Sequence, residues 1–139
     1  MATFNKFNQF VEDVAEKVHN LGSDQLAIAL CAAANAPVAT NSVLANLTQI
    51  SYTNLSSRNV TTSASAQSSG TYKLTLADLV LTASGAVATF RYVALYNDTP
   101  TSPADPLIGW YDYGSDVTLA NGETFTIDFD GTNGVLTLA

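Results

Sequence analysis

The second half of the sequence alternates apolar and polar residues in short runs that turn-forming residues interrupt. Tyr72 to Leu76 and Phe90 to Tyr96 place apolar side chains at every second position, and Leu107 to Tyr113 forms a further short run. A period of two residues matches a β-strand, whose successive side chains point to opposite faces. About six to eight such runs predict a mainly β protein, an antiparallel β-sandwich or barrel-like domain.

An amphipathic stripe marks the N-terminal segment, where apolar residues are spaced by three and four positions. The stripe predicts an amphipathic α-helix over residues 1–22. A short helix is marginally stable in water unless it packs against something. Packing on its own domain and packing on a partner or a symmetry mate both remain open. The stripe is therefore the candidate interface, and it comprises Phe4, Phe7, Val11, Val14 and Val18.

The rest of the chain, residues 23–139, is predicted to form one β-sandwich domain that makes a single structural unit with the helix. Leu26 to Cys31 alternates large and small apolar residues and predicts a strand, with a helix as the alternative because alanine favours helices. Asn41 to Ile50 suits a short capped helix. Asn121-Gly122 separates two alternating runs and predicts a β-hairpin. In Phe90 to Tyr96 the intervening positions are largely apolar as well, which predicts burial on both faces.

The composition is poor in ions. Charged residues make up 12% of the chain, about half of the usual share, and 17 threonines, 12 serines and 11 asparagines stand in their place. Small uncharged side chains lose less free energy than ions when they leave water. The composition therefore favours a protein whose surface is partly covered by neighbours, with a monomer of uncharged surface as the alternative. In such a chain, Arg58 and Arg91 are each expected to have a fixed partner, such as a carboxylate within the fold or across an interface.

The negative charge is concentrated in the last third. All five Lys and Arg residues precede position 92, whereas residues 92–139 hold seven carboxylates, and the net charge of the chain is −7. This surplus argues against nucleic-acid binding. No run of about 18 apolar residues occurs, so the sequence predicts no membrane partner. A cation-binding edge and plain turn-forming aspartates are the two interpretations of the acidic end.

Few residues of this sequence could carry chemistry. His19 is the single histidine and Cys31 the single cysteine, and neither stands in a recognisable catalytic or metal-binding pattern. No catalytic residue and no cofactor are therefore expected. Asp128 and Asp130 resemble part of a calcium loop, but Gly131 falls at the fourth position instead of the sixth and no glutamate closes the loop. They are weak metal candidates, with a plain Asp-Gly turn as the alternative.

Several stretches of the sequence resemble small structural proteins of tailed bacteriophages. They run from Val18 to Leu30, Ala36 to Asn41, Val43 to Leu47, Phe90 to Asp98 and Pro106 to Gly114. These are packing and turn patterns without a chemical site, so no site residues are carried over. The resemblance implies a virion component, most simply a head decoration (cement) protein or a minor capsid protein. Related modules also resemble tail or fibre parts.

The expected function is therefore non-enzymatic. A decoration protein would stabilise the assembled head, bind the major capsid protein or another virion protein, form a homo-oligomer, and reside in the virion after assembly in the host cytoplasm. The alternative in the same particle is a tail or fibre component that binds a receptor. A small hydrolase with paired carboxylates, such as Asp112 and Asp116, is the alternative of a different class, but nothing else in the sequence converges on that pair.

Overall fold

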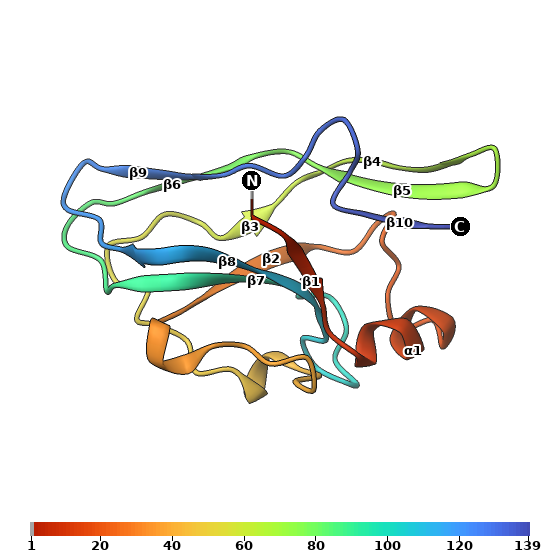
Figure 1. Ribbon diagram of the computed structural model, residues 1–139, viewed down its shortest axis with the longest axis horizontal. Coiled ribbons are helices and arrows are strands. Elements are labelled where there is room, and N and C mark those ends of the chain that lie inside the picture. The colour runs from red at the N-terminus through yellow and green to blue at the C-terminus, as the bar shows by residue number, and fades with distance from the viewer. Residues whose placement is uncertain (1) are drawn as a thin grey trace.

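The computed structural model describes residues 2–139 and confirms a mainly β protein in which antiparallel sheets pack together. One short helix lies near the N-terminus, and the described strands do not close into a barrel (Figure 1). The larger sheet has five strands in the order β1-β8-β7-β2-β3. Their bounds are Phe4–Lys6 (β1), Leu107–Val117 (β8), Phe90–Asn97 (β7), Leu26–Cys31 (β2) and Asn59–Val60 (β3).

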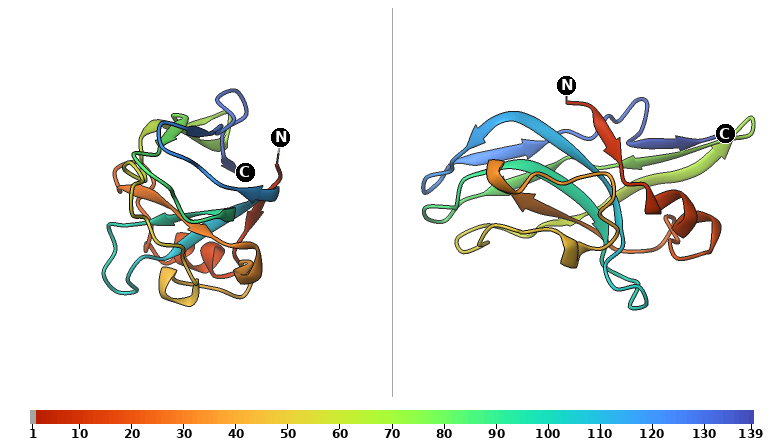
Figure 2. Two further views of the ribbon diagram at one scale, coloured as in Figure 1. Left: turned by 90° about the vertical axis from the view of Figure 1, so that its left-hand side faces the viewer. Right: turned by 60° about the horizontal axis from the view of Figure 1, so that its bottom comes forward.

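A second layer faces this sheet and consists of two smaller sheets (Figure 1). One has three strands in the order β10-β5-β4, and the other pairs β6 with β9. Figure 1 and the right view of Figure 2 place the β4–β5 hairpin at the same end of the molecule as the helix. The bounds are Thr62–Ser68 (β4), Thr71–Leu76 (β5), Leu79–Thr82 (β6), Thr124–Ile127 (β9) and Leu136–Leu138 (β10).

The central strands of the five-stranded sheet are buried on both faces. The strand β2 sends Ile28 and Leu30 into the main core between the two layers, and sends Ala27 and Ala29 into a second cluster on the opposite face. The segment that follows β2 covers this second cluster with apolar side chains such as Leu44. All six residues of β2 are buried as a result. The strand β7 likewise contributes to both clusters, so the predicted burial of this strand on both faces is confirmed.

The N-terminal helix is much shorter than predicted. The helix α1 spans Gln9–Ala15, whereas Phe4 lies in β1 opposite Tyr111. Phe7 is fully buried in the second cluster, and the centroid of its ring lies 4.6 Å from that of Trp110. The prediction of a helix over 1–22 is wrong for residues 2–8 and 16–22, because residues 4–6 pair with β8 and Phe7 packs into the second cluster. Residue 1 lies outside the described residues. No helix among the described residues has the length and apolarity needed to cross a bilayer.

Asn121-Gly122 forms a tight turn but not the predicted hairpin. The amide of Glu123 donates to the carbonyl of Ala120 (3.0 Å), and Gly122 has a φ of 84°. The hairpin turn favoured by Asn-Gly needs positive φ at both central positions, and Asn121 does not have it. The flanking strands therefore separate, because β8 pairs with β7 and β1, whereas β9 pairs with β6.

The helix predicted over residues 41–50 is a single 3-10 turn, Leu44–Asn46. The side-chain carbonyl of Asn46 accepts hydrogen bonds from the amides of Ser42 and Val43, at 3.0 and 3.2 Å. A side chain of the turn itself therefore provides the hydrogen-bond acceptor for the backbone amides that precede it. The prediction of a longer helix is wrong, because this segment instead spreads over the sheet and packs Leu44 and Leu47 against the second cluster.

Candidate interaction sites

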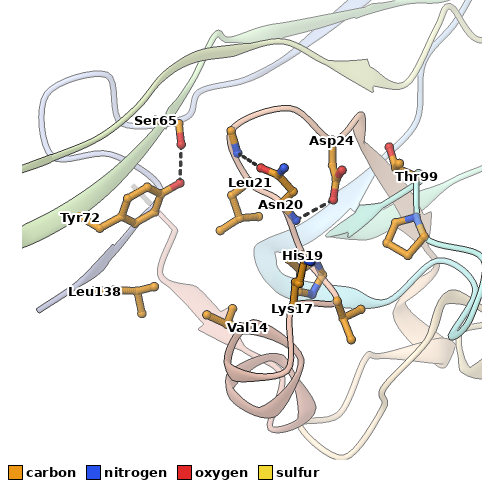
Figure 3. Close-up of a pocket in the computed structure, with 13 residues that line it drawn as sticks. Val14, Lys17, His19, Asn20, Leu21, Asp24, Ser65, Tyr72, Thr99 and Leu138 are labelled. Atoms are coloured by element: carbon orange, nitrogen blue, oxygen red, sulfur yellow. Dashed lines mark hydrogen bonds between the residues drawn. The ribbon is translucent and has the colours of Figure 1, made fainter.

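A cavity of about 610 Å³ opens at the end of the molecule where α1 meets the second layer. Val14 of α1 forms one wall, and Tyr72 of β5 and Leu138 of β10 line the cavity from the second layer (Figure 3). Leu21 and Pro100, which belong to two loops, add to the apolar lining. This α1 cavity therefore joins segments from the beginning, the middle and the end of the chain.

The predicted interface residues divide between the α1 cavity and the interior. Val14 and Val18 line the cavity, and Val11 of α1 is 50% exposed. Phe4 is half-buried against Tyr111, and Phe7 is fully buried. A fully buried side chain touches no partner, so the assignment of Phe7 to an interface is corrected to a place in the core. The three valines keep their place as interface candidates.

A buried polar cluster lies beside the cavity. The Asn97 amide group donates to Nδ1 of His19 (3.1 Å) and to Oδ2 of Asp24 (2.7 Å). Asp24 also accepts from the backbone amide of Asn20 (2.8 Å; Figure 3), and Oδ1 of Asn97 accepts from the amide of Thr99 (3.1 Å). These bonds tie the loop after α1 to the end of β7, and they hold one side of the cavity in place.

His19 acts in this cluster as an uncharged hydrogen-bonding group. Because Nδ1 accepts from Asn97, the ring proton lies on Nε2. Among the described residues, His19 Nε2 and Asp13 Oδ2 are the buried side-chain atoms without a hydrogen-bond partner. Burial lowers the pKa of His19, and the nearby carboxylates of Asp13 and Asp24 oppose that shift. The imidazole is therefore neutral at pH 7.

A second cleft, of about 310 Å³, lies between β8 and β9. Tyr111 and Tyr113 of β8 and Phe125 of β9 supply aromatic walls, and Asp128 adds a carboxylate. Tyr113 is 54% exposed. Trp110, the neighbour of Tyr111, points to the opposite face of the sheet and packs on the second cluster, as the alternation of a strand requires. We call this site the aromatic cleft.

The residues considered for chemistry do not form a reactive group. Burial raises the pKa of Cys31 to about 11, so the side chain is a thiol at neutral pH. The Asp130 carboxylate accepts hydrogen bonds from Asn133 and Thr132, which lower its pKa and order the loop before β10. Asp128 instead lines the aromatic cleft. Within residues 2–139, no group of three or more His, Cys, Asp or Glu is placed to hold a metal ion.

Both arginines have partners within the fold: Arg91 pairs with a carboxylate, whereas Arg58 bonds to a backbone carbonyl. Arg91 makes a two-point ion pair with Asp112 that joins β7 to β8, with N–O distances of 2.8 and 3.1 Å. Arg58 donates to the carbonyl of Ile28 (2.7 Å), and its guanidinium carbon lies 3.6 Å from the ring centroid of Tyr52. Asp112 therefore links two strands of the sheet through its ion pair, which argues against a catalytic pair with Asp116.

Comparisons of this chain with protein-family models, with curated proteins and with solved structures found no match. The geometry of the α1 cavity and of the aromatic cleft therefore carries the functional argument. The sequence pattern pointed to the valines of the first site, and it predicted the strand that carries the tyrosines of the second. It missed the opposite walls, Leu138 and Phe125, because each reaches its site through strand pairing that no local pattern records.

Proposed function

We propose that this chain is a non-enzymatic structural protein of a bacteriophage virion, and that it decorates the head and stabilises it. The observation that carries the proposal is the apolar lining and surroundings of the α1 cavity. Val14 and Val18 line this cavity with Leu138, which is 39% exposed, and Val11 on the same helix is 50% exposed. Exposed apolar surface around a recess suits contact with another protein.

The edge strand β4 supports contact with further copies of the chain or with a virion protein. It lies at the outside of the three-stranded sheet, and none of its seven residues is buried. Natural edge strands are commonly protected by lysine or proline, because their free N–H and C=O groups invite pairing with another chain. The strand β4 contains no charged residue and no proline. A homo-oligomer is therefore part of the proposal.

Stabilisation of the head follows from selective binding. A subunit that binds the assembled lattice and not the separated capsid protein adds about 2.7 kcal/mol per site when its free concentration is about a hundred times Kd. The Ser, Thr and Asn residues of the surface favour this contact, because they lose less free energy on desolvation than ions do. The proposed partner is the major capsid protein, the proposed location is the virion, and assembly takes place in the host cytoplasm without a cofactor or nucleic-acid contact.

Two variants with equally exposed valines test this surface. Val11 on α1 and Val80 on β6 are 50% and 51% exposed, so a glutamate is solvated at either position. Val11→Glu is expected to reduce incorporation into particles at least about tenfold, because it places a charge at the apolar contact. Val80→Glu is the matched control and should be incorporated like the wild type. Equal incorporation of both variants would contradict the proposed contact surface.

The exposed ring of Tyr113 favours one alternative in the same particle, a tail or fibre component that binds a receptor. The copy number of the chain in purified particles, measured by quantitative mass spectrometry, separates the two functions. Hundreds of copies indicate the head or the tail tube, and an averaged image of the particle distinguishes these two positions. A handful of copies indicates a baseplate or a fibre and contradicts decoration of the head.

A further inference from the structure

The aromatic cleft has walls that the core holds in place. Tyr113 and Phe125 meet edge to face with ring centroids 5.2 Å apart, and Phe125 meets Phe90 of the core at 5.3 Å. Tyr111 packs on Phe4, with ring centroids 5.0 Å apart. Rings fixed in this way lose little conformational entropy when a ligand binds. The cleft is therefore preformed, and its volume of about 310 Å³ suits a small group or a single side chain.

Among the described residues, the charged side chain that lines the cleft is negative. Asp128 lines it, and no Lys or Arg among the described residues does. Burial, together with the carboxylates of Asp128 and Asp130, raises the pKa of Tyr111 to about 12. A site of this kind attracts cations and repels anions.

The chain's own cations are largely engaged elsewhere. Arg91 is paired with Asp112, and Arg58 lies over the ring of Tyr52. The ammonium group of Lys73 donates to the carbonyl of a loop residue (2.9 Å), and Lys17 lines the α1 cavity. None of these four side chains lines the cleft, so its carboxylate is open to a cation from another molecule.

We propose that the aromatic cleft binds the cationic side chain of a lysine or arginine presented by a partner protein. The faces of the aromatic rings attract a cation through their quadrupole, and Asp128 supplies an opposite charge. The apolar arm of such a side chain packs on Val93 and Ile127, which also line the cleft. A neutral sugar can stack on the rings, but its binding is not strengthened by the negative charge of Asp128. The proposal does not depend on the virion role.

A pair of short peptides tests the proposal on the full chain. One peptide carries a single lysine between glycines, and the other carries the same lysine acetylated, which keeps the arm and removes the charge. We expect the lysine peptide to shift the NMR signals of the Tyr111 and Tyr113 rings. Acetylation should weaken its binding about three- to tenfold, as expected for the loss of a cation–π contact.

Two variants with the same change of charge locate the effect. Asp128→Asn removes the carboxylate from the cleft and should weaken binding of the lysine peptide several-fold. Asp116→Asn is the matched control, because Asp116 is exposed on β8 and does not line the cleft. Binding by this control should equal that of the wild type.

Three results would overturn the proposal. The first is equal binding of the lysine and acetyl-lysine peptides, which would make the cleft an apolar site. The second is an equal loss of binding in Asp128→Asn and Asp116→Asn, which would reduce the effect to overall charge. The third is a shift of the tyrosine signals by glucose but not by the lysine peptide, which would assign the cleft to a neutral sugar.

Discussion

The strands β2 and β4 are similar in length and opposite in their surroundings. All six residues of β2 are buried, whereas none of the seven residues of β4 is. The sequence of β2 alternates large and small apolar residues, so that the large ones fill the main core and the alanines let a covering segment approach the other face. The sequence of β4 is small and mostly polar on both faces.

This difference assigns stability and contact to different parts of the molecule. The five-stranded sheet lies between two apolar clusters and supplies the rigid frame. The second layer is divided into two small sheets and presents one face and an uncharged edge to solvent. A change that disturbs β2 should therefore act on folding, whereas a change in β4 should act on association. Four predictions compare the frame with the surface.

The largest effect is expected from a glutamate in β2. Ala29 is fully buried opposite Ala94 of β7. Ala29→Glu buries a carboxylate without a partner, which costs several kcal/mol of a total stability of about 5–15 kcal/mol. We expect this variant to show no cooperative melting transition by circular dichroism. A melting curve like that of the wild type would mean that the covering segment over β2 is loosely packed.

The next effect is expected at Phe7, which fills the second cluster against Trp110. Phe7→Ala should lower the free energy of unfolding by about 3–5 kcal/mol, because it leaves a cavity in a packed site. Val11→Ala, at the exposed position of the same N-terminal stripe, should change it by less than about 0.5 kcal/mol. Urea denaturation measures both. Equal losses of stability in the two variants would favour the continuous N-terminal helix that the sequence predicted.

A smaller, pH-dependent effect is expected from His19. Because burial lowers its pKa in the folded chain, the unfolded chain binds the proton more readily. Stability is complete above the ordinary value of 6.5, falls as the pH drops through it, and levels off below the folded pKa. The melting temperature should therefore fall between about pH 7.5 and pH 5.5, and His19→Gln should lack this decrease. Asp112 and Asp130, whose pKa values lie below 3.8, act outside this window. The same decrease in both proteins would assign it to other groups.

The sequence predicted those parts of the fold that local alternation encodes. The runs that became β2, β5, β7 and β8 were identified because their period of two residues survives in the structure. The prediction of a long N-terminal helix was wrong. Apolar residues spaced by three and four positions also fit a chain that pairs with β8 through Phe4 and then forms a short helix. The predicted turn at Gly122 is present. The predicted pairing of the two strands beside it is wrong, because β9 pairs with β6, which lies far away in the sequence.

For the same reason, the sequence predicted one wall of the α1 cavity and, at the aromatic cleft, only a strand. The stripe contained Val14 and Val18, yet their opposite wall at Leu138 depends on β10 pairing with β5. Alternation placed Tyr111 and Tyr113 on one face of a strand, but Phe125 joins them only once β9 is fixed by its pairing with β6. The residues that one strand or helix contributes to a site can be predicted from the sequence. A cavity between several elements can be predicted only when the order of strands in the sheets is known.

The smallest effect on stability is expected from a glutamate in β4, the counterpart of the change in β2. Ala66 is exposed and lies opposite Lys73 of β5, so Ala66→Glu gains an opposite charge across the strands. We expect the free energy of unfolding to change by less than about 0.5 kcal/mol. The same charge protects the edge against pairing with another chain, so self-association measured by light scattering should weaken. If stability and association both stay unchanged, β4 is no contact surface. If Ala66→Glu unfolds the chain as Ala29→Glu does, the second layer contributes as much to folding as the frame.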